Sequence, residues 1–176
     1  MLKSCNTFDS ICDQNNRFRA SIILMKELKN ILREPTEKTP HIDFNYLTGE
    51  LILTGRSIPE NATVIFEPLL KWVNEYINNS RPTTNLRLNL EYFNTASSIW
   101  LAKIVKSLSK IKEPDNVLFI HLYFDIEEYD NMEIEDIKDA LSPVVDIINN
   151  SIISIGVKIY GTDSNGVVIK ESMVLI

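Results

Sequence analysis

The side chains best placed for chemistry lie in one short stretch, Asn94-Thr95-Ala96-Ser97-Ser98. An alternating apolar pattern ends there and a helical pattern begins. Asn94 or Thr95 could simply cap the new helix, with the two serines in its first turn. Alternatively, one hydroxyl could carry a phosphate, because the free N–H groups and the positive dipole of a helix N-terminus stabilise an anion. The residue types alone leave both interpretations open.

Strand and helix patterns alternate on both sides of this stretch. The sequence predicts a hairpin at 41–57, a helix at 61–79, a strand at 85–93, a helix at 95–112, a strand at 116–125, a helix at 132–150 and a hairpin at 156–175. Strands that alternate with helices after a first hairpin are typical of an α/β sandwich with a mixed sheet.

Three features sharpen these predictions. Ser57 and Glu60 have the spacing of a capping box, which predicts that Ser57 opens the helix at 61–79. Pro68 lies inside that helix and predicts a kink or a restart. The near-continuous apolar run at 116–125 is typical of a strand buried on both faces, with His121 as a hydrogen-bonded core or edge residue.

The N-terminal region shows apolar side chains at helical spacing over residues 17–34, which predicts an amphipathic helix before a proline-bounded linker. We therefore expect three parts. They are an N-terminal helical extension and linker at 1–38, an α/β domain at 39–150, and a C-terminal β-hairpin at 151–176 that packs on the domain.

Composition excludes several classes of protein. The chain has 176 residues and a net charge of -6, without a basic stripe, which argues against binding to nucleic acids or anionic membranes. No signal peptide and no apolar run of membrane-spanning length are present, so we expect a cytoplasmic protein without membrane insertion. The two cysteines, Cys5 and Cys12, form no CxxC motif and fit reduced thiols.

Motifs for catalysis and cofactor binding are also missing. Glycine-rich phosphate loops and a G-x-S-x-G elbow do not occur, and a catalytic triad would need His41 or His121. The acidic residues from Asp125 to Asp139 match no EF-hand loop and fit a solvated loop and an exposed helix face. Asp125 at a strand end is similar to the phosphorylated aspartate of receiver domains, but their acidic pair after the first strand is absent. We expect no enzyme, no metal and no cofactor.

Several motifs together resemble the SiaC family of bacterial regulatory phosphoproteins. They are Gly55-Arg56-Ser57, Pro59-Glu60-Asn61, Glu67-Pro68-Leu69-Leu70 and Tyr92-Phe93-Asn94-Thr95, within a similarity from about residue 40 to 130. The resemblance implies a STAS-like fold, that of anti-sigma-factor antagonists. It also implies a partner switch, in which a dedicated SiaB-type kinase phosphorylates a threonine and a SiaA-type metal-dependent phosphatase removes the phosphate.

The family threonine corresponds to Thr95. The resemblance implies that the unmodified protein binds a diguanylate cyclase and promotes cyclic-di-GMP synthesis and biofilm formation. It also implies a partner-binding surface, made of Asn94, Ala96, Ser97, Ser98, Arg56, Glu60 and Asn61. This chain departs from the family at Ala96, where a serine is usual, and at Ile99-Trp100, where more polar residues are expected.

A second hypothesis is a constitutive scaffold domain of the anti-sigma-factor-antagonist type. In that case Thr95 would be only a helix cap, and no phosphate would be found on the protein.

Overall fold

The computed structural model describes residues 28–132 and 151–175. Its strands are β1 (Ile31–Arg33), β2 (His41–Asn45), β3 (Glu50–Ser57), β4 (Thr83–Phe93), β5 (Val117–Asp125), β6 (Ser154–Thr162) and β7 (Val168–Leu175). Its helices are α2 (Ala62–Tyr76), α3 (Thr95–Leu108) and α4 (Ile126–Asn131). The predicted helix at 132–150 and most of the one at 17–34 lie outside the described residues.

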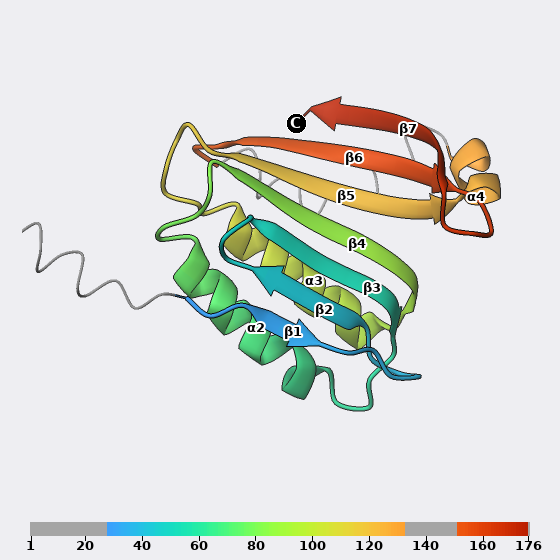
Figure 1. The fold of residues 1–176 in the computed structure, drawn as a ribbon, viewed down its shortest axis with the longest axis horizontal. Helices are drawn as coiled ribbons and strands as arrows, with labels where there is room; N and C mark the ends of the chain where they lie inside the picture. The colour runs from blue at the N-terminus through green and yellow to red at the C-terminus, as the bar shows by residue number, and fades with distance from the viewer. Residues whose placement is uncertain (1–27, 133–150, 176) are drawn as a thin grey trace, which may run out of the picture.

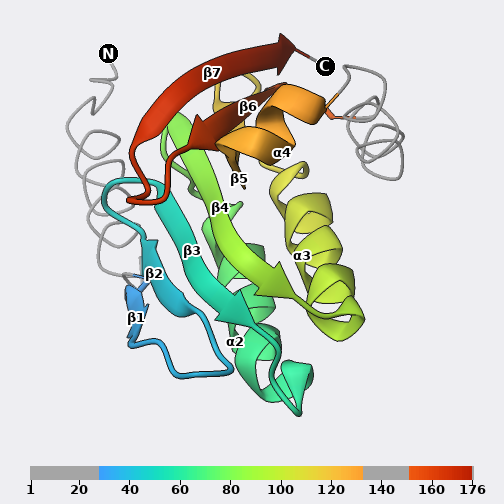
Figure 2. The same cartoon turned by 90° about the vertical axis from the view of Figure 1, so that its right-hand side faces the viewer.

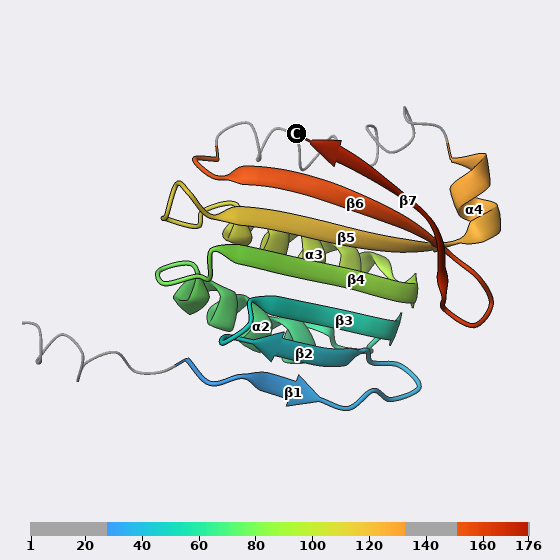
Figure 3. The same ribbon diagram turned by 45° about the horizontal axis from the view of Figure 1, so that its top comes forward.

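The strands form one mixed sheet in the order β1-β2-β3-β4-β5-β6-β7. Strands β3, β4, β5 and β6 run parallel to one another, while β2 pairs antiparallel with β1 and β3, and β7 pairs antiparallel with β6. Both predicted hairpins are confirmed. The C-terminal hairpin continues the sheet through the parallel pairing of β6 with β5 (Figures 1 and 3). The division of the chain into three parts stays a prediction.

Helices α2 and α3 cover one face of this sheet (Figure 2). The side chains of the core between them are fully buried and include Phe66, Leu69, Val73, Ile104 and Leu108 from the helices and Leu51, Leu53, Leu86 and Leu118 from the strands. The helix α2 runs through Pro68 without interruption, so the predicted restart does not occur. A packed core of this kind holds the strand-to-helix turns in fixed positions.

The opposite face of the sheet carries a polar cluster around His121. On this face His121 is buried while Phe119 and Tyr123 are half-buried, so the predicted burial of β5 on both faces is partial, and the prediction of His121 as a hydrogen-bonded core residue is confirmed. His121 Nε2 lies 2.9 Å from Asn85 Oδ1, and Nδ1 lies 3.0 Å from the Tyr160 hydroxyl. Burial and the positive charges of Arg87 and Lys158 lower the pKa of His121 to about 4, so the ring is neutral near pH 7.

The segment before β2 corrects another prediction. Residues 31–33 form a strand that pairs with β2, with Ile31 opposite Phe44, so the predicted helix does not extend through them. The Trp72 side chain on α2 donates a hydrogen bond of 2.6 Å from Nε1 to the carbonyl of Lys29. In a helix that carbonyl would accept a hydrogen bond from the helix's own backbone. The contacts of this segment with α2 and β2 therefore decide its structure against the helical spacing of its apolar residues.

Candidate functional site

The turn from β4 into α3 contains the candidate hydroxyls, and its N-cap is Asn94. The Asn94 backbone is extended, at φ -88° and ψ 167°, and its Oδ1 accepts a hydrogen bond of 2.9 Å from the backbone N–H of Ser97. The Asn94 backbone N–H donates to the carbonyl of Ser57 over 3.0 Å. Thr95 is the first residue of the helix, so the alternative that Thr95 is its cap is wrong.

A buried pair of hydroxyls lies beneath this turn. Ser57 and Ser97 are both fully buried. Ser57 Oγ donates to Ser97 Oγ, and Ser97 Oγ donates to the Ser57 carbonyl, each over 2.9 Å. The predicted capping box is therefore wrong: α2 is capped by Asn61, whose Oδ1 accepts from the Thr63 N–H, while Ser57 joins the end of β3 to α3.

Gly55 lies where the pairing of β3 with β4 becomes irregular. Gly55 has φ +93°, a conformation that other residues adopt only with strain. The pairing of β3 with β4 shifts there, so that Glu91 becomes an extra residue and Arg56 lies opposite Tyr92. Such a bulge re-aims the side chains that follow it on its own strand, which here are Tyr92 and Phe93 of β4. The Gly55-Arg56-Ser57 motif thus sets the end of β3 against the β4–α3 turn.

The three hydroxyls of the turn differ in accessibility. Ser97 is buried and bonded, and the half-buried Ser98 donates from Oγ to the Thr95 carbonyl over 2.8 Å. Thr95 is exposed, and its hydroxyl makes no hydrogen bond to any residue that the structure describes. The first turn of α3 contains no acidic side chain. Thr95 is therefore the hydroxyl that another molecule reaches most easily, at a helix end that favours an anion.

Exposed apolar side chains flank Thr95. Tyr92 is 60% exposed, Phe93 48% and Ile99 53%. Ile99 follows Thr95 by four residues, so the two side chains share one face of α3. Tyr92 lies opposite the exposed Arg56 and Phe93 opposite the buried Ser57, so these two side chains leave the end of β4 on opposite faces of the sheet. Exposed large apolar side chains around one turn are typical of interaction sites.

The other predicted partner-binding residues occupy different positions. Arg56, Glu60, Asn61 and Ala96 are exposed, while Asn94 is half-buried. Ser97 is fully buried and cannot contact a partner in this conformation, so we correct its predicted role to that of an anchor of the turn.

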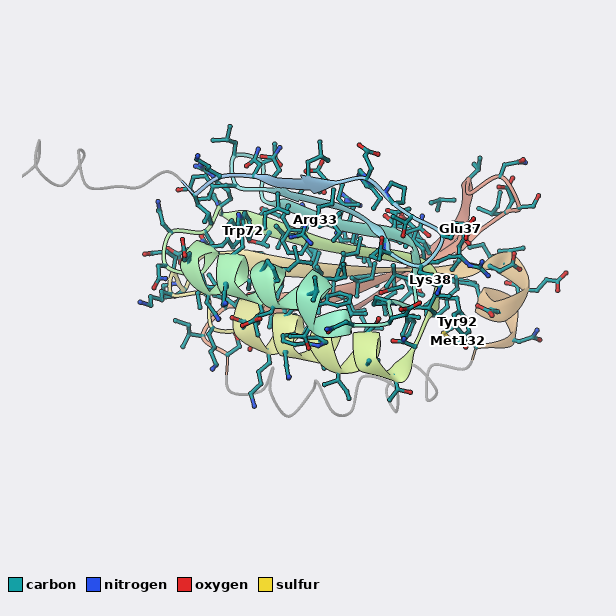
Figure 4. All side chains as sticks on the ribbon, turned by 90° about the horizontal axis from the view of Figure 1, so that it is seen from below. Arg33, Glu37, Lys38, Trp72, Tyr92 and Met132 are labelled. Atoms are coloured by element: carbon teal, nitrogen blue, oxygen red, sulfur yellow. The ribbon has the colours of Figure 1, made fainter. Side chains whose placement is uncertain are left out.

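Sequence reasoning missed the ion pair of Glu60 with Lys38, at 2.6 Å. The Lys38 carbonyl accepts from the Ile58 N–H over 2.9 Å, so the loop before β2 lies beside the residues that follow β3. Lys38 and Tyr92 lie at the same end of the molecule (Figure 4). The hydrogen bond from Lys38 lowers the pKa of the exposed Glu60 carboxyl. Nothing in the sequence pattern links these two residues, which are 22 positions apart.

The acidic stretch begins at a second strand-to-helix turn. Asp125 caps α4, and its Oδ1 accepts from the Glu127 N–H over 2.8 Å, with Glu127 and Glu128 in the first turn. No group of three or more His, Cys, Asp or Glu residues suited to a metal ion is found in the parts of the chain that the structure describes. Within the same ranges, no helix is long and apolar enough to cross a membrane.

Comparison with known proteins identifies the family. A sequence model of the SiaC family of regulatory phosphoproteins matches residues 33–149. The chain belongs to the SiaC family. An uncharacterized protein of Pseudomonas aeruginosa (strain UCBPP-PA14) is 27% identical over 90 residues, which are 51% of this chain and 71% of that protein.

Solved structures of the family share the fold. Apo-SiaC from Pseudomonas aeruginosa superposes with a TM-score of 0.55 at 19% identity, covering 73% of this chain and 98% of that one. SiaC bound to the diguanylate cyclase SiaD, which that protein activates, gives a TM-score of 0.56 at 19% identity, covering 74% and 99%. The mixed α/β fold expected from the sequence is thus confirmed.

Proposed function

We propose that the protein is a regulatory phosphoprotein without catalytic activity, switched by a phosphate on Thr95. One observation carries the proposal: Thr95 is exposed in the first turn of α3 and its hydroxyl makes no hydrogen bond within residues 28–132 and 151–175, whereas Ser97 is buried. A kinase of the SiaB type would add the phosphate, and a phosphatase of the SiaA type would remove it.

The proposed output partner is a diguanylate cyclase in the cytoplasm. Support comes from the family membership and from the SiaC relative that is described as the activator of its cyclase. In this proposal the unmodified protein binds the cyclase through the β4–α3 turn, raising cyclic-di-GMP and favouring biofilm formation. Tyr92, Phe93 and Ile99 would supply apolar contact area, and the exposed Arg56 and Asn61 would supply polar contacts at its rim.

The phosphate is proposed to act on the partner surface and to leave the fold intact. Asn94 and the Ser57–Ser97 pair hold the turn from below, and none of their hydrogen bonds uses the Thr95 side chain. Phosphorylation would add about -1.5 to -2 charges to a surface with three exposed apolar side chains. Burying that charge without a partner would cost several kcal/mol, or roughly a hundredfold or more in affinity.

Site mapping tests the modification. The full chain is incubated with its cognate kinase and ATP, and intact mass and peptide mapping are measured for wild type, Thr95→Ala and the matched control Ser98→Ala. Wild type and Ser98→Ala should each gain one phosphate, and Thr95→Ala none. Phosphorylation of Thr95→Ala to the wild-type extent would overturn the assignment.

A constitutive scaffold domain remains the second hypothesis. The scaffold hypothesis assigns Thr95 the role of the helix cap, but the cap is Asn94. The scaffold hypothesis predicts no added phosphate on protein isolated from its native cell, so the same mass measurement separates the two.

A further inference from the structure

The C-terminal strand β7 is an open edge of the sheet. Among the described residues it pairs only with β6, and its eight residues, Val168–Leu175, present their other side outward (Figures 1 and 3). An edge strand carries a row of unpaired N–H and C=O groups, which is a template for another strand. This strand lies beyond the residues that the family model matches, 33–149.

Large apolar side chains line this edge on the face opposite α2 and α3. Met173 pairs with Lys158 and Ser172 pairs with the buried Ile159 on β6, so Ser172 faces the helices and Met173 the open face. Ile169 is the extra residue at a bulge in β7, where the pairing shifts from Lys170 opposite Gly161 to Val168 opposite Thr162. The side chains of Ile169 and Met173 are 55% and 53% exposed, and Val168 is 44% exposed. An apolar, exposed edge of this length is normally covered in a native protein.

The opposite edge of the sheet shows how edges are usually protected. The strand β1 has three residues, and Pro35 follows two residues after its end. By contrast, β7 is regular after the bulge at Ile169 and contains no proline, and its one lysine, Lys170, is bound to Asp130 on α4 at 2.6 Å. The charge that could block pairing at this edge is therefore neutralised by a neighbour in the same chain.

We propose that β7 pairs antiparallel with β7 of a second copy, joining two sheets into one across a twofold axis. A second copy offers the same edge, so that the outward backbone groups of its regular part, which follows the bulge at Ile169, pair with their own counterparts. The chain as a whole carries a net charge of -6, which opposes association. The strand has only two charged side chains, Lys170 and Glu171, and Lys170 is paired with Asp130, so Glu171 is the one charge of the strand that the interface must accommodate.

The side chains favour one register. A twofold axis perpendicular to the sheet keeps each residue on its own face, so paired positions must differ by an even number. Pairing most of the strand then requires the axis to pass at Glu171 or at Ser172. An axis at Glu171 would place two carboxylates directly opposite each other, which is destabilising. An axis at Ser172 places two hydroxyls opposite each other and Glu171 opposite Met173 of the second copy.

The oligomeric state of the full chain tests the interface. Light scattering after size exclusion, over a range of concentrations, should show a dimer for wild type. The variant Ile169→Lys/Met173→Lys should raise the dissociation constant by at least about tenfold, because two lysines would enter the apolar part of the interface. The matched control Leu47→Lys changes a side chain of similar exposure at the β2–β3 turn and should leave the dimer intact. A wild-type monomer, or equal dimerisation of the double-lysine variant, would overturn the proposal.

Cross-linking tests the register. In a background with Cys5→Ser and Cys12→Ser, the single variants Ser172→Cys and Glu171→Cys are oxidised and separated under non-reducing conditions. Ser172→Cys should form the covalent dimer faster. Faster cross-linking of Glu171→Cys would overturn the Ser172-centred register, and no cross-linking by either variant would overturn the β7 interface itself.

Discussion

Two neighbouring parallel strands end in strand-to-helix turns, and the two turns have opposite electrostatic character. After β4, the neutral amide of Asn94 caps a helix of 14 residues with no acid in its first turn. After β5, the carboxylate of Asp125 caps a helix of six residues with Glu127 and Glu128 in its first turn. The favourable end of the second helix is already occupied by negative charge, while that of the first is not.

This difference explains why only one of the two turns suits a phosphate. A phosphate near Asp125 would meet three carboxylates, whereas one on Thr95 would meet free N–H groups and no acidic side chain of the first turn. The underlying packing also differs. The first turn of α3 is anchored by a buried serine pair, but α4 buries none of its own residues. We therefore expect the proposed phosphate on Thr95 to leave the structure of the β4–α3 turn intact.

The largest predicted effect on the free energy of unfolding comes from the strand before the second turn. That strand, β5, carries the buried His121. Its pKa of about 4 lies below the value near 6.5 in an unfolded chain, so acid protonates the unfolded state first. This contribution to stability is complete above pH 6.5 and is lost as the pH falls toward 4. Its total is about 3 kcal/mol.

Urea unfolding of wild type and His121→Gln between pH 7 and pH 4 measures this effect. The gap in unfolding free energy between the two proteins should shrink with falling pH. A gap that stays constant would show that His121 titrates alike in the folded and unfolded chain.

A smaller effect is expected from the serine pair, which has no counterpart at the β5–α4 turn. Ser97→Ala leaves the buried Ser57 hydroxyl without its acceptor and should cost about 1–3 kcal/mol of stability. The double variant Ser57→Ala/Ser97→Ala should cost less than the sum of the single variants, because no unpaired hydroxyl remains. Thermal and urea unfolding complete this double-mutant cycle, and strictly additive losses would contradict the described pairing.

The smallest predicted effect on the free energy of unfolding comes from the two N-cap residues, Asn94 and Asp125. Asn94→Ala should lower the free energy of unfolding by about 1 kcal/mol. Asp125→Ala should lower it by a few tenths, about 0.3 kcal/mol, because α4 is short and exposed. Thr95→Ala is the control and should stay within about 0.5 kcal/mol of wild type, since Thr95 is not the cap. Equal losses for Thr95→Ala and Asn94→Ala in urea unfolding would revise the assignment of the cap.

The sequence predicted most elements of the fold because their apolar periodicity is strong, as in the helix after Thr95 and both hairpins. The sequence-based predictions failed where a contact between residues far apart in the chain determines the local structure. Residues 31–33 form a strand because β2 and Trp72 hold them, and Ser57 is buried against Ser97, which lies 40 positions away in the sequence. Alternation with Leu51 and Leu53 could have placed Ser57 on the buried face. The choice of Asn94 over Thr95 as the cap depends on backbone angles that composition does not encode.

The most direct test of the account is the affinity of the unmodified and the Thr95-phosphorylated full chain for the cognate diguanylate cyclase. Calorimetry with both forms, and circular dichroism of each alone, separates a surface effect from a change of fold. The account predicts affinity roughly a hundredfold or more weaker for the phosphorylated form, with unchanged spectra. Equal affinities for the two forms would contradict the switch at the β4–α3 turn.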